Sequence, residues 1–137
     1  MKSTNFTYRG KTYRLAFTAG ALFDLYDKYG PVDSVLDLVE PTTKAGWSAT
    51  CWLLEKMSHY GELQRRYLGE HESDELTAGS INLTSDPTDV ARLKDAVRAA
   101  VYLGFSRSVE DSDDAPDVDL VLKELEEKKA PPSSAAE

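Results

Sequence analysis

The amino-terminal part of the chain alternates between hydrophobic and polar positions. In the run Thr12–Phe17 the large apolar residues occupy every second position, which is the two-residue period of a β-strand with one buried face. The shorter run Phe6–Tyr8 is also aromatic and β-branched, and Gly10 lies between the two runs. This pattern predicts a β-hairpin, which must pack against other elements because an isolated hairpin is only marginally stable.

From residue 19 onward the pattern changes to the 3.6-residue period of amphipathic helices. A first helix is predicted over residues 19–29, with Thr18 as its N-cap and Gly30 as the residue that ends it. A second, short helix is predicted over residues 32–39, where valines and leucines form one stripe that stops before a proline.

A third predicted helix follows Thr42 or Thr43, since either hydroxyl can accept hydrogen bonds from the first free N–H groups. This helix is apolar around much of its circumference, which is typical of the central helix of a bundle. It ends at Tyr60, or it passes Gly61 and continues to Leu68. The pattern leaves both ends open.

Residues 69–83 are polar, and their pattern allows only a helical turn that begins near Thr77. The sequence Ser85-Asp86-Pro87 is then typical of a helix start, because Ser or Asp caps free N–H groups and proline is tolerated in the first turn. The apolar period continues to Leu103, and we expect Gly104 to end this helix.

These elements predict a mostly α fold, with one small helical domain and a short N-terminal β-hairpin over residues 1–105. A chain of 137 residues suits one domain of ordinary size. Residues 106–117 consist mainly of Ser, Asp, Ala and Pro, which predicts a flexible acidic linker. A short amphipathic helix over residues 118–129 and a disordered terminus over residues 130–137 complete the predicted C-terminal tail.

The predicted helix over residues 118–129 has apolar residues at i, i+3, i+4 and i+7. This spacing allows a helix to place its apolar stripe in a partner's groove. The same stripe can instead dock on its own domain, and the sequence leaves the two alternatives open. Its four apolar residues are Val118, Val121, Leu122 and Leu125.

Charge is unevenly distributed along the chain. The net charge is −8, from 16 basic and 24 acidic side chains. Residues 106–137 hold 10 of the acidic and 4 of the basic side chains, which leaves a net charge of −6 there and −2 on residues 1–105. Because an acidic surface repels nucleic-acid phosphates and anionic lipids, we expect no nucleic acid and no membrane as partner.

Other features favour a cytoplasmic protein. No apolar run approaches the ~20 residues of a transmembrane helix. The first residues lack the apolar core of a secretory signal. Cys51 is the only cysteine, so no intramolecular disulfide can form.

No group of residues has the spacing of a known catalytic or metal site. His59 and His71 have no cysteine pair that would complete a zinc site. Ser48 lies in a sequence that lacks the final glycine of a nucleophile elbow. Cys51 falls on an apolar helix face, where burial makes a thiol a poor nucleophile, and the carboxylates of residues 110–119 lack the spacing of a calcium loop. We therefore expect no catalytic residue, no cofactor and no metal.

The order of these motifs resembles a known family. Residues 6–30 combine a glycine hairpin, an apolar strand and an Ala-Leu helix that ends in glycine, and residues 47–60, 75–77 and 100–105 supply a central apolar helix, a Glu-Leu-Thr segment and a late helix. Over residues 6–105 the chain resembles the tail assembly chaperones of long-tailed bacteriophages and the related gene-transfer-agent proteins. The first part of the resemblance is carried by Gly10, Leu15, Phe17, Ala21, Leu22, Leu25 and Gly30.

The resemblance implies a protein-binding function without catalysis. Such chaperones bind the tape-measure protein, a long helical chain prone to aggregation, and help recruit tail-tube subunits in the cytoplasm of the bacterial host. They are absent from the mature virion. A structural connector or completion protein of the phage tail remains an alternative, as does a small helical enzyme with an unrecognised site.

A helical module that performs this task needs an apolar groove for amphipathic helices. The predicted partner-binding residues of the helical domain are Leu22, Phe23, Tyr26, Trp47 and Trp52. In the tail they are Val118, Val121, Leu122 and Leu125.

Overall fold

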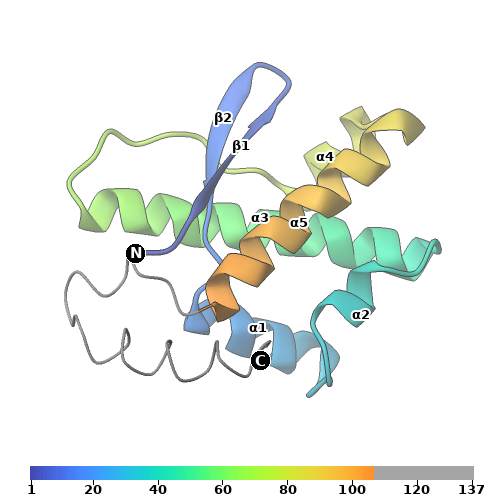
Figure 1. The fold of residues 1–137 in the computed structure, drawn as a ribbon. Helices are drawn as coiled ribbons and strands as arrows, with labels where there is room; N and C mark the ends of the chain where they lie inside the picture. The colour runs from blue at the N-terminus through green and yellow to red at the C-terminus, as the bar shows by residue number, and fades with distance from the viewer. Residues whose placement is uncertain (107–137) are drawn as a thin grey trace, which may run out of the picture. The chain divides into compact units, whose positions relative to one another are not determined.

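The computed structural model describes residues 1–106 and confirms a mostly helical fold with an N-terminal antiparallel hairpin (Figure 1). The elements are β1 (Thr4–Tyr8), β2 (Lys11–Leu15), α1 (Ala19–Tyr29), α2 (Leu36–Val39), α3 (Lys44–Tyr67), α4 (Ala78–Thr84), the 3₁₀ turn η1 (Pro87–Asp89) and α5 (Val90–Phe105). The structural predictions for residues 107–137, including those for Val118, Val121, Leu122 and Leu125, lie outside the described residues.

The hairpin forms because its turn suits the twist of its strands. Arg9 and Gly10 both have positive φ, 52° and 83°, which is the backbone of a two-residue type I′ turn. The strands pair antiparallel, with Thr4 opposite Leu15. Strand β2 stops at Leu15 rather than at the predicted Phe17, because the next residue, Ala16, donates its backbone N–H to the carbonyl of Met57 on α3 (3.0 Å).

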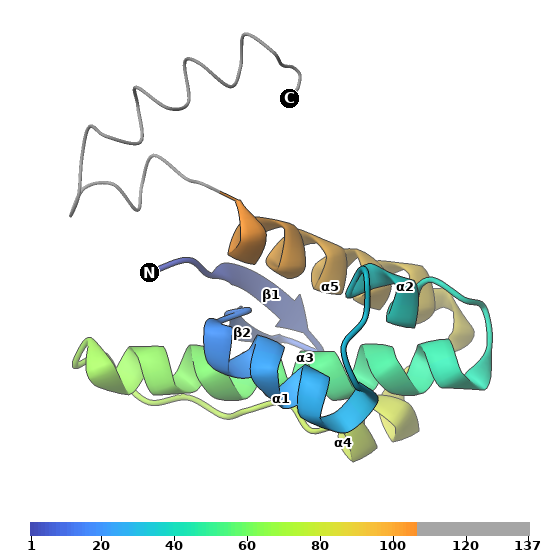
Figure 2. The same cartoon turned by 90° about the horizontal axis from the view of Figure 1, so that it is seen from below.

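Helix α3 is the central element of the described part. It contacts β2, α1, α2, α4 and α5, and Figure 2 shows β1 between α3 and α5 with α4 on the opposite side of α3. The longer of the two predicted versions is correct, since the helix passes Gly61 and ends at Tyr67. Glycine is required there because a Cβ at position 61 would come within 1.8 Å of the carbonyl oxygen of Arg14 on β2.

The predicted second helix is too long. Only Leu36–Val39 is helical, although Val32 is half-buried and Val35 is buried against the core. The apolar stripe over residues 32–39 therefore reflects burial of the segment. Within the described part of the chain, only the carbonyls of Ser34 and Val35 in its first half accept backbone hydrogen bonds, from Asp37 and Leu38 (both 3.1 Å).

The predicted end of the last helix is also wrong. Helix α5 includes Gly104 and ends at Phe105. A Cβ at Gly104 would lie 2.6 Å from the carbonyl oxygen of Phe17, so the glycine serves close packing rather than helix termination. At the other end Asp86 and Asp89 form a reciprocal capping box around η1, and α5 begins at Val90.

The helical turn predicted near Thr77 is confirmed as α4. The Thr77 hydroxyl accepts a hydrogen bond from the backbone N–H of Ser80 (3.2 Å), and the helix continues to Thr84. The N-caps Thr18 of α1 and Thr43 of α3 act in the same way on Ala21 and Gly46. These caps are local interactions, which is why the sequence indicates them.

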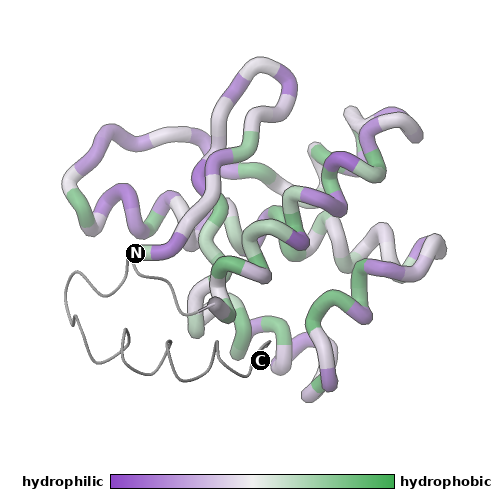
Figure 3. Tube along the Cα trace, viewed as in Figure 1, coloured by the Kyte–Doolittle hydropathy of each residue, from purple (hydrophilic) through white to green (hydrophobic). Residues whose placement is uncertain are grey.

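The hydrophobic core takes side chains from β1, β2 and the helices α1 to α5, and Figure 3 shows hydrophobic positions concentrated in the middle of the described part. Its largest fully buried side chains include Leu15, Leu25, Leu53, Leu54, Met57, Ile81 and Leu93. Within residues 1–106, no helix combines the length and the apolar composition that crossing a membrane requires.

Candidate functional site

An open hollow of about 560 Å³ runs along α3 between residues of α1 and α4. We call it the aromatic groove. Trp47 and Trp52 are its largest lining residues, and small side chains of α3 and α4 line much of the remainder. The groove is lined by Lys28, Tyr29, Ala45, Trp47, Ser48, Cys51, Trp52, Ala78, Gly79 and Asn82.

Trp47 is held in place by α4. Its indole N–H donates a hydrogen bond to Oδ1 of Asn82 (2.8 Å), and the ring is half-buried against the core. A second hollow, of about 360 Å³, shares Trp47 as a wall and includes Lys44 and Val90 in its lining. Trp47 therefore separates two neighbouring hollows along the first turns of α3.

Trp52 lies among an aromatic ring and two ammonium groups. The Tyr29 ring meets it edge-on, with centroids 5.7 Å apart. The Nζ atoms of Lys28 and Lys56 lie 6.0 Å and 5.7 Å from the centroid of the Trp52 ring, within the range of cation–π attraction. Burial raises the pKa of Tyr29 above its usual value, so its phenol is neutral at physiological pH.

Lys56 is positioned by a short polar chain of contacts. The Tyr60 hydroxyl donates to Oδ2 of Asp24 (2.7 Å), and the same oxygen lies 3.7 Å from Nζ of Lys56. The hydrogen bond to Asp24, together with burial, raises the pKa of Tyr60. These contacts hold an ammonium group at the rim of the groove beside Trp52.

The thiol of Cys51 and the hydroxyl of Ser48 lack the surroundings that would activate them as nucleophiles. Burial raises the pKa of the Cys51 thiol to about 11, so the thiol is protonated at neutral pH and is a weak nucleophile. Ser48 is exposed, and the residues that line the groove include no histidine that could act as its base. Among residues 1–106, no three His, Cys, Asp or Glu side chains gather as metal ligands would. The groove is suited to binding apolar side chains.

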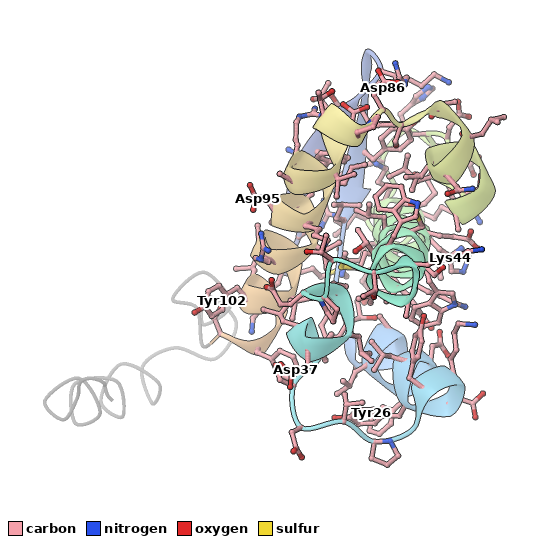
Figure 4. All side chains as sticks on the ribbon, turned by 90° about the vertical axis from the view of Figure 1, so that its right-hand side faces the viewer. Tyr26, Asp37, Lys44, Asp86, Asp95 and Tyr102 are labelled. Atoms are coloured by element: carbon pink, nitrogen blue, oxygen red, sulfur yellow. The ribbon has the colours of Figure 1, made fainter. Side chains whose placement is uncertain are left out.

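The predicted partner-binding residues of the body do not form one surface. Trp47 and Trp52 share the aromatic groove. Tyr26 on α1 lines a separate pocket of about 340 Å³ with residues of α2 and α5. Figure 4 shows Tyr26, Asp37 and Tyr102 projecting from α1, α2 and α5. Phe23 is 65% exposed and meets the Tyr26 ring edge-on, whereas Leu22 is half-buried against the core.

Several residues in and beside the groove were not predicted from the sequence. Lys56, beside the groove, lies at i+4 from Trp52 on α3, and this spacing was available as a signal for it. Lys28, Tyr29 and Asn82 come from α1 and α4. No pattern along the chain indicates that these helices flank Trp47 and Trp52.

No protein-family model matches the chain, no curated protein matches its sequence, and no solved structure matches its fold. The function is therefore inferred from the groove itself and from the family resemblance of residues 6–105.

Proposed function

We propose that the protein is a tail assembly chaperone of a long-tailed bacteriophage or a related particle. It binds helical segments of the tape-measure protein in the aromatic groove and keeps that protein soluble until tail-tube subunits polymerise around it. The observation that carries the proposal is the open apolar groove of about 560 Å³, in which Trp47 and Trp52 remain only half-buried. The resemblance of residues 6–105 to the chaperone family supports the same function.

The energetics of the groove suit an amphipathic helix. Half-buried tryptophans in a concave apolar surface are the residues most often found as interface hot spots, and each costs about 2 kcal/mol or more when truncated. A helix offers anchors at i, i+3 or i+4 and i+7, which can fill hollows on either side of Trp47. A segment covered in this way no longer exposes its apolar stripe to other copies of the tape-measure protein.

The test is coexpression with the tape-measure protein encoded in the same phage genome. We expect the full chain to raise the soluble fraction of that protein and to copurify with it. The variant Gly79→Leu adds a side chain inside the groove, where a Cβ meets no other atom within 4 Å, so the fold is retained while the groove is filled. This variant and Trp52→Ala should reduce copurification by about tenfold or more, the loss of at least one hot-spot contact.

Tyr102→Ala is the matched control, because Tyr102 is 75% exposed and lies outside the groove. Circular dichroism of each variant confirms that the helices are retained. The proposal fails if wild-type protein leaves the tape-measure protein insoluble, or if Gly79→Leu and Tyr102→Ala behave alike.

A further inference from the structure

Lysines lie at the aromatic groove and beside it, and one of them, Lys28, is among its lining residues. Lys28 lies on α1 with its Nζ 5.5 Å from the Tyr29 centroid, and Lys56 lies on α3 beside Trp52. Lys44 is exposed at the start of α3 (Figure 4) and lines the second hollow next to Trp47. Lys44 and Lys56 are 12 residues apart on α3, or ~18 Å of helix, and Lys28 approaches Trp52 from α1.

Two of these lysines, Lys28 and Lys44, are available to a partner. Within residues 1–106, Lys28 and Lys44 form no ion pair with a carboxylate. Two carboxylates near Trp52 are already engaged: Asp24 binds Tyr60 and Lys56, and Glu55 accepts a hydrogen bond from the backbone N–H of Ala78 (2.7 Å). Lys28 and Lys44 thus offer positive charge that no ion pair within residues 1–106 neutralises, whereas Lys56 is paired with Asp24.

The positive rim contrasts with the rest of the molecule. The whole chain has a net charge of −8, yet salt screens charges beyond about 8 Å under physiological conditions. A ligand in the groove therefore experiences the rim lysines more strongly than distant carboxylates. A helix with carboxylates flanking its apolar stripe satisfies both the floor and the rim.

We infer that the occupant of the aromatic groove is an acidic amphipathic helix, with apolar anchors in the hollows on both sides of Trp47 and with Asp or Glu side chains paired to Lys28 and Lys44. The inference rests on the proposed function and specifies the chemistry of the bound tape-measure segment.

A single-stranded nucleic acid would use similar residue types, since bases stack on aromatic rings and phosphates bind lysines. The geometry disfavours it. Trp52 already contacts the edge of Tyr29 and the ammonium groups of Lys28 and Lys56, so its ring has less free area for a base. The acidic chain also repels a phosphate backbone.

The test uses the full chain and its intrinsic fluorescence. Both tryptophans of the protein, Trp47 and Trp52, line the groove, so a ligand without tryptophan that enters it changes the emission directly. The probes are a synthetic amphipathic helix with Glu beside its leucine stripe, the same peptide with every Glu replaced by Lys, the acidic peptide with every Leu replaced by Ser, and oligo(dT).

We expect the acidic amphipathic peptide to bind about tenfold or more tightly than the lysine peptide at low salt, with the difference shrinking as salt rises. The serine peptide should not bind, because it lacks apolar anchors. The double variant Lys28→Glu with Lys44→Glu should weaken binding of the acidic peptide by about tenfold or more. Lys11→Glu is the control, because Lys11 pairs with Asp74 on the hairpin side of the molecule and lies outside the groove.

Equal binding of the two charged peptides, no binding of either, or binding of oligo(dT) would overturn the inference. So would self-association through the groove, seen as an oligomer in sedimentation that the Gly79→Leu variant abolishes. The coexpression experiment separates the two hypotheses. If the groove-dependent chaperone activity is intact but the two charged peptides bind equally well, only the hypothesis of an acidic helix is rejected. If the acidic peptide binds but the protein has no effect on the tape-measure protein, the chaperone function is rejected.

Discussion

Three glycines on helices allow backbones to approach closely. A Cβ at Gly61 would lie 1.8 Å from the carbonyl oxygen of Arg14, one at Gly46 would lie 2.0 Å from that of Pro41, and one at Gly104 would lie 2.6 Å from that of Phe17. In each case the obstacle is backbone rather than the end of a flexible side chain. The glycines therefore let α3 pack closely against the backbone at Arg14 and Pro41, and let α5 pack closely against the backbone at Phe17.

Gly61→Ala should therefore destabilise the protein by about 2 kcal/mol, since the added methyl forces β2 away from α3. Gly79→Ala is the control. A Cβ there meets no atom within 4 Å, and alanine is the better helix former, so stability should rise by about 0.5 kcal/mol. Urea denaturation of both variants measures the difference. Equal stabilities would show that β2 and α3 do not pack as closely as described.

Side chains of α3 hold the segment that follows it. Glu62, which is 2% exposed, accepts a hydrogen bond from the backbone N–H of Ser73 (2.8 Å). The Ser58 hydroxyl accepts from the N–H of Leu76 (2.8 Å). Glu55 accepts from the N–H of Ala78 (2.7 Å). A segment with little regular structure is thus ordered by three acceptors at successive turns of one helix.

Ser58→Ala should remove the acceptor of the Leu76 N–H and leave that buried donor unsatisfied, at a cost of about 1–3 kcal/mol. Native-state hydrogen exchange at Leu76 should accelerate, because the segment opens more often. Ser80→Ala, at an exposed position on α4, should leave that exchange unchanged. Unaltered protection of Leu76 in Ser58→Ala would mean that the hydrogen bond does not hold the segment.

Helix α2 and helix α5 are joined in a different way. The Arg98 guanidinium on α5 donates from Nε and Nη2 to both carboxylate oxygens of Glu40 (2.8 and 2.9 Å), and this contact lowers the pKa of Glu40. Lys94, which is 8% exposed, donates to the backbone carbonyls of Glu40 and Pro41. These contacts fix the end of α2 and thereby the start of α3, where Lys44 and Trp47 belong to the candidate site.

The proposed function makes a prediction about the assembled particle. A chaperone leaves when tail-tube subunits replace it, so mass spectrometry of purified particles should detect the tube and tape-measure proteins but not this chain. An infected-cell lysate, in which the chain should be abundant, is the control. Stoichiometric amounts in the particle would instead identify a structural connector or completion protein of the tail.

Much of the local structure could be predicted from the sequence. The first helix, 19–29, has the predicted bounds and the predicted cap, Thr18. Of the two predicted caps of the third helix, Thr43 is the one that acts, and a helix begins after Thr77, near which a helical turn was predicted. The errors occur where tertiary contact overrides a local signal. Gly104 reads as a helix stop but serves packing, and the stripe over residues 32–39 packs on the core with only four residues in a helix.

The candidate site was predicted only in part, because it too depends on tertiary contacts between helices. Trp47 and Trp52 were predicted as partner-binding residues and line the groove, but Tyr26 and Phe23, predicted with them, do not line it. Lys28 and Asn82, which are far from Trp52 and Trp47 in sequence, were not identified.

Periodicity, capping and turn chemistry act over a few residues, so the amino-acid sequence alone determined the mostly helical class, the hairpin and most helix positions. The groove is composed of side chains from α1, α3 and α4. Those helices are brought together by burial of apolar surface, which depends on area and not on distance along the chain. Only the packed structure could therefore decide which aromatic residues share a surface and which lysines surround it.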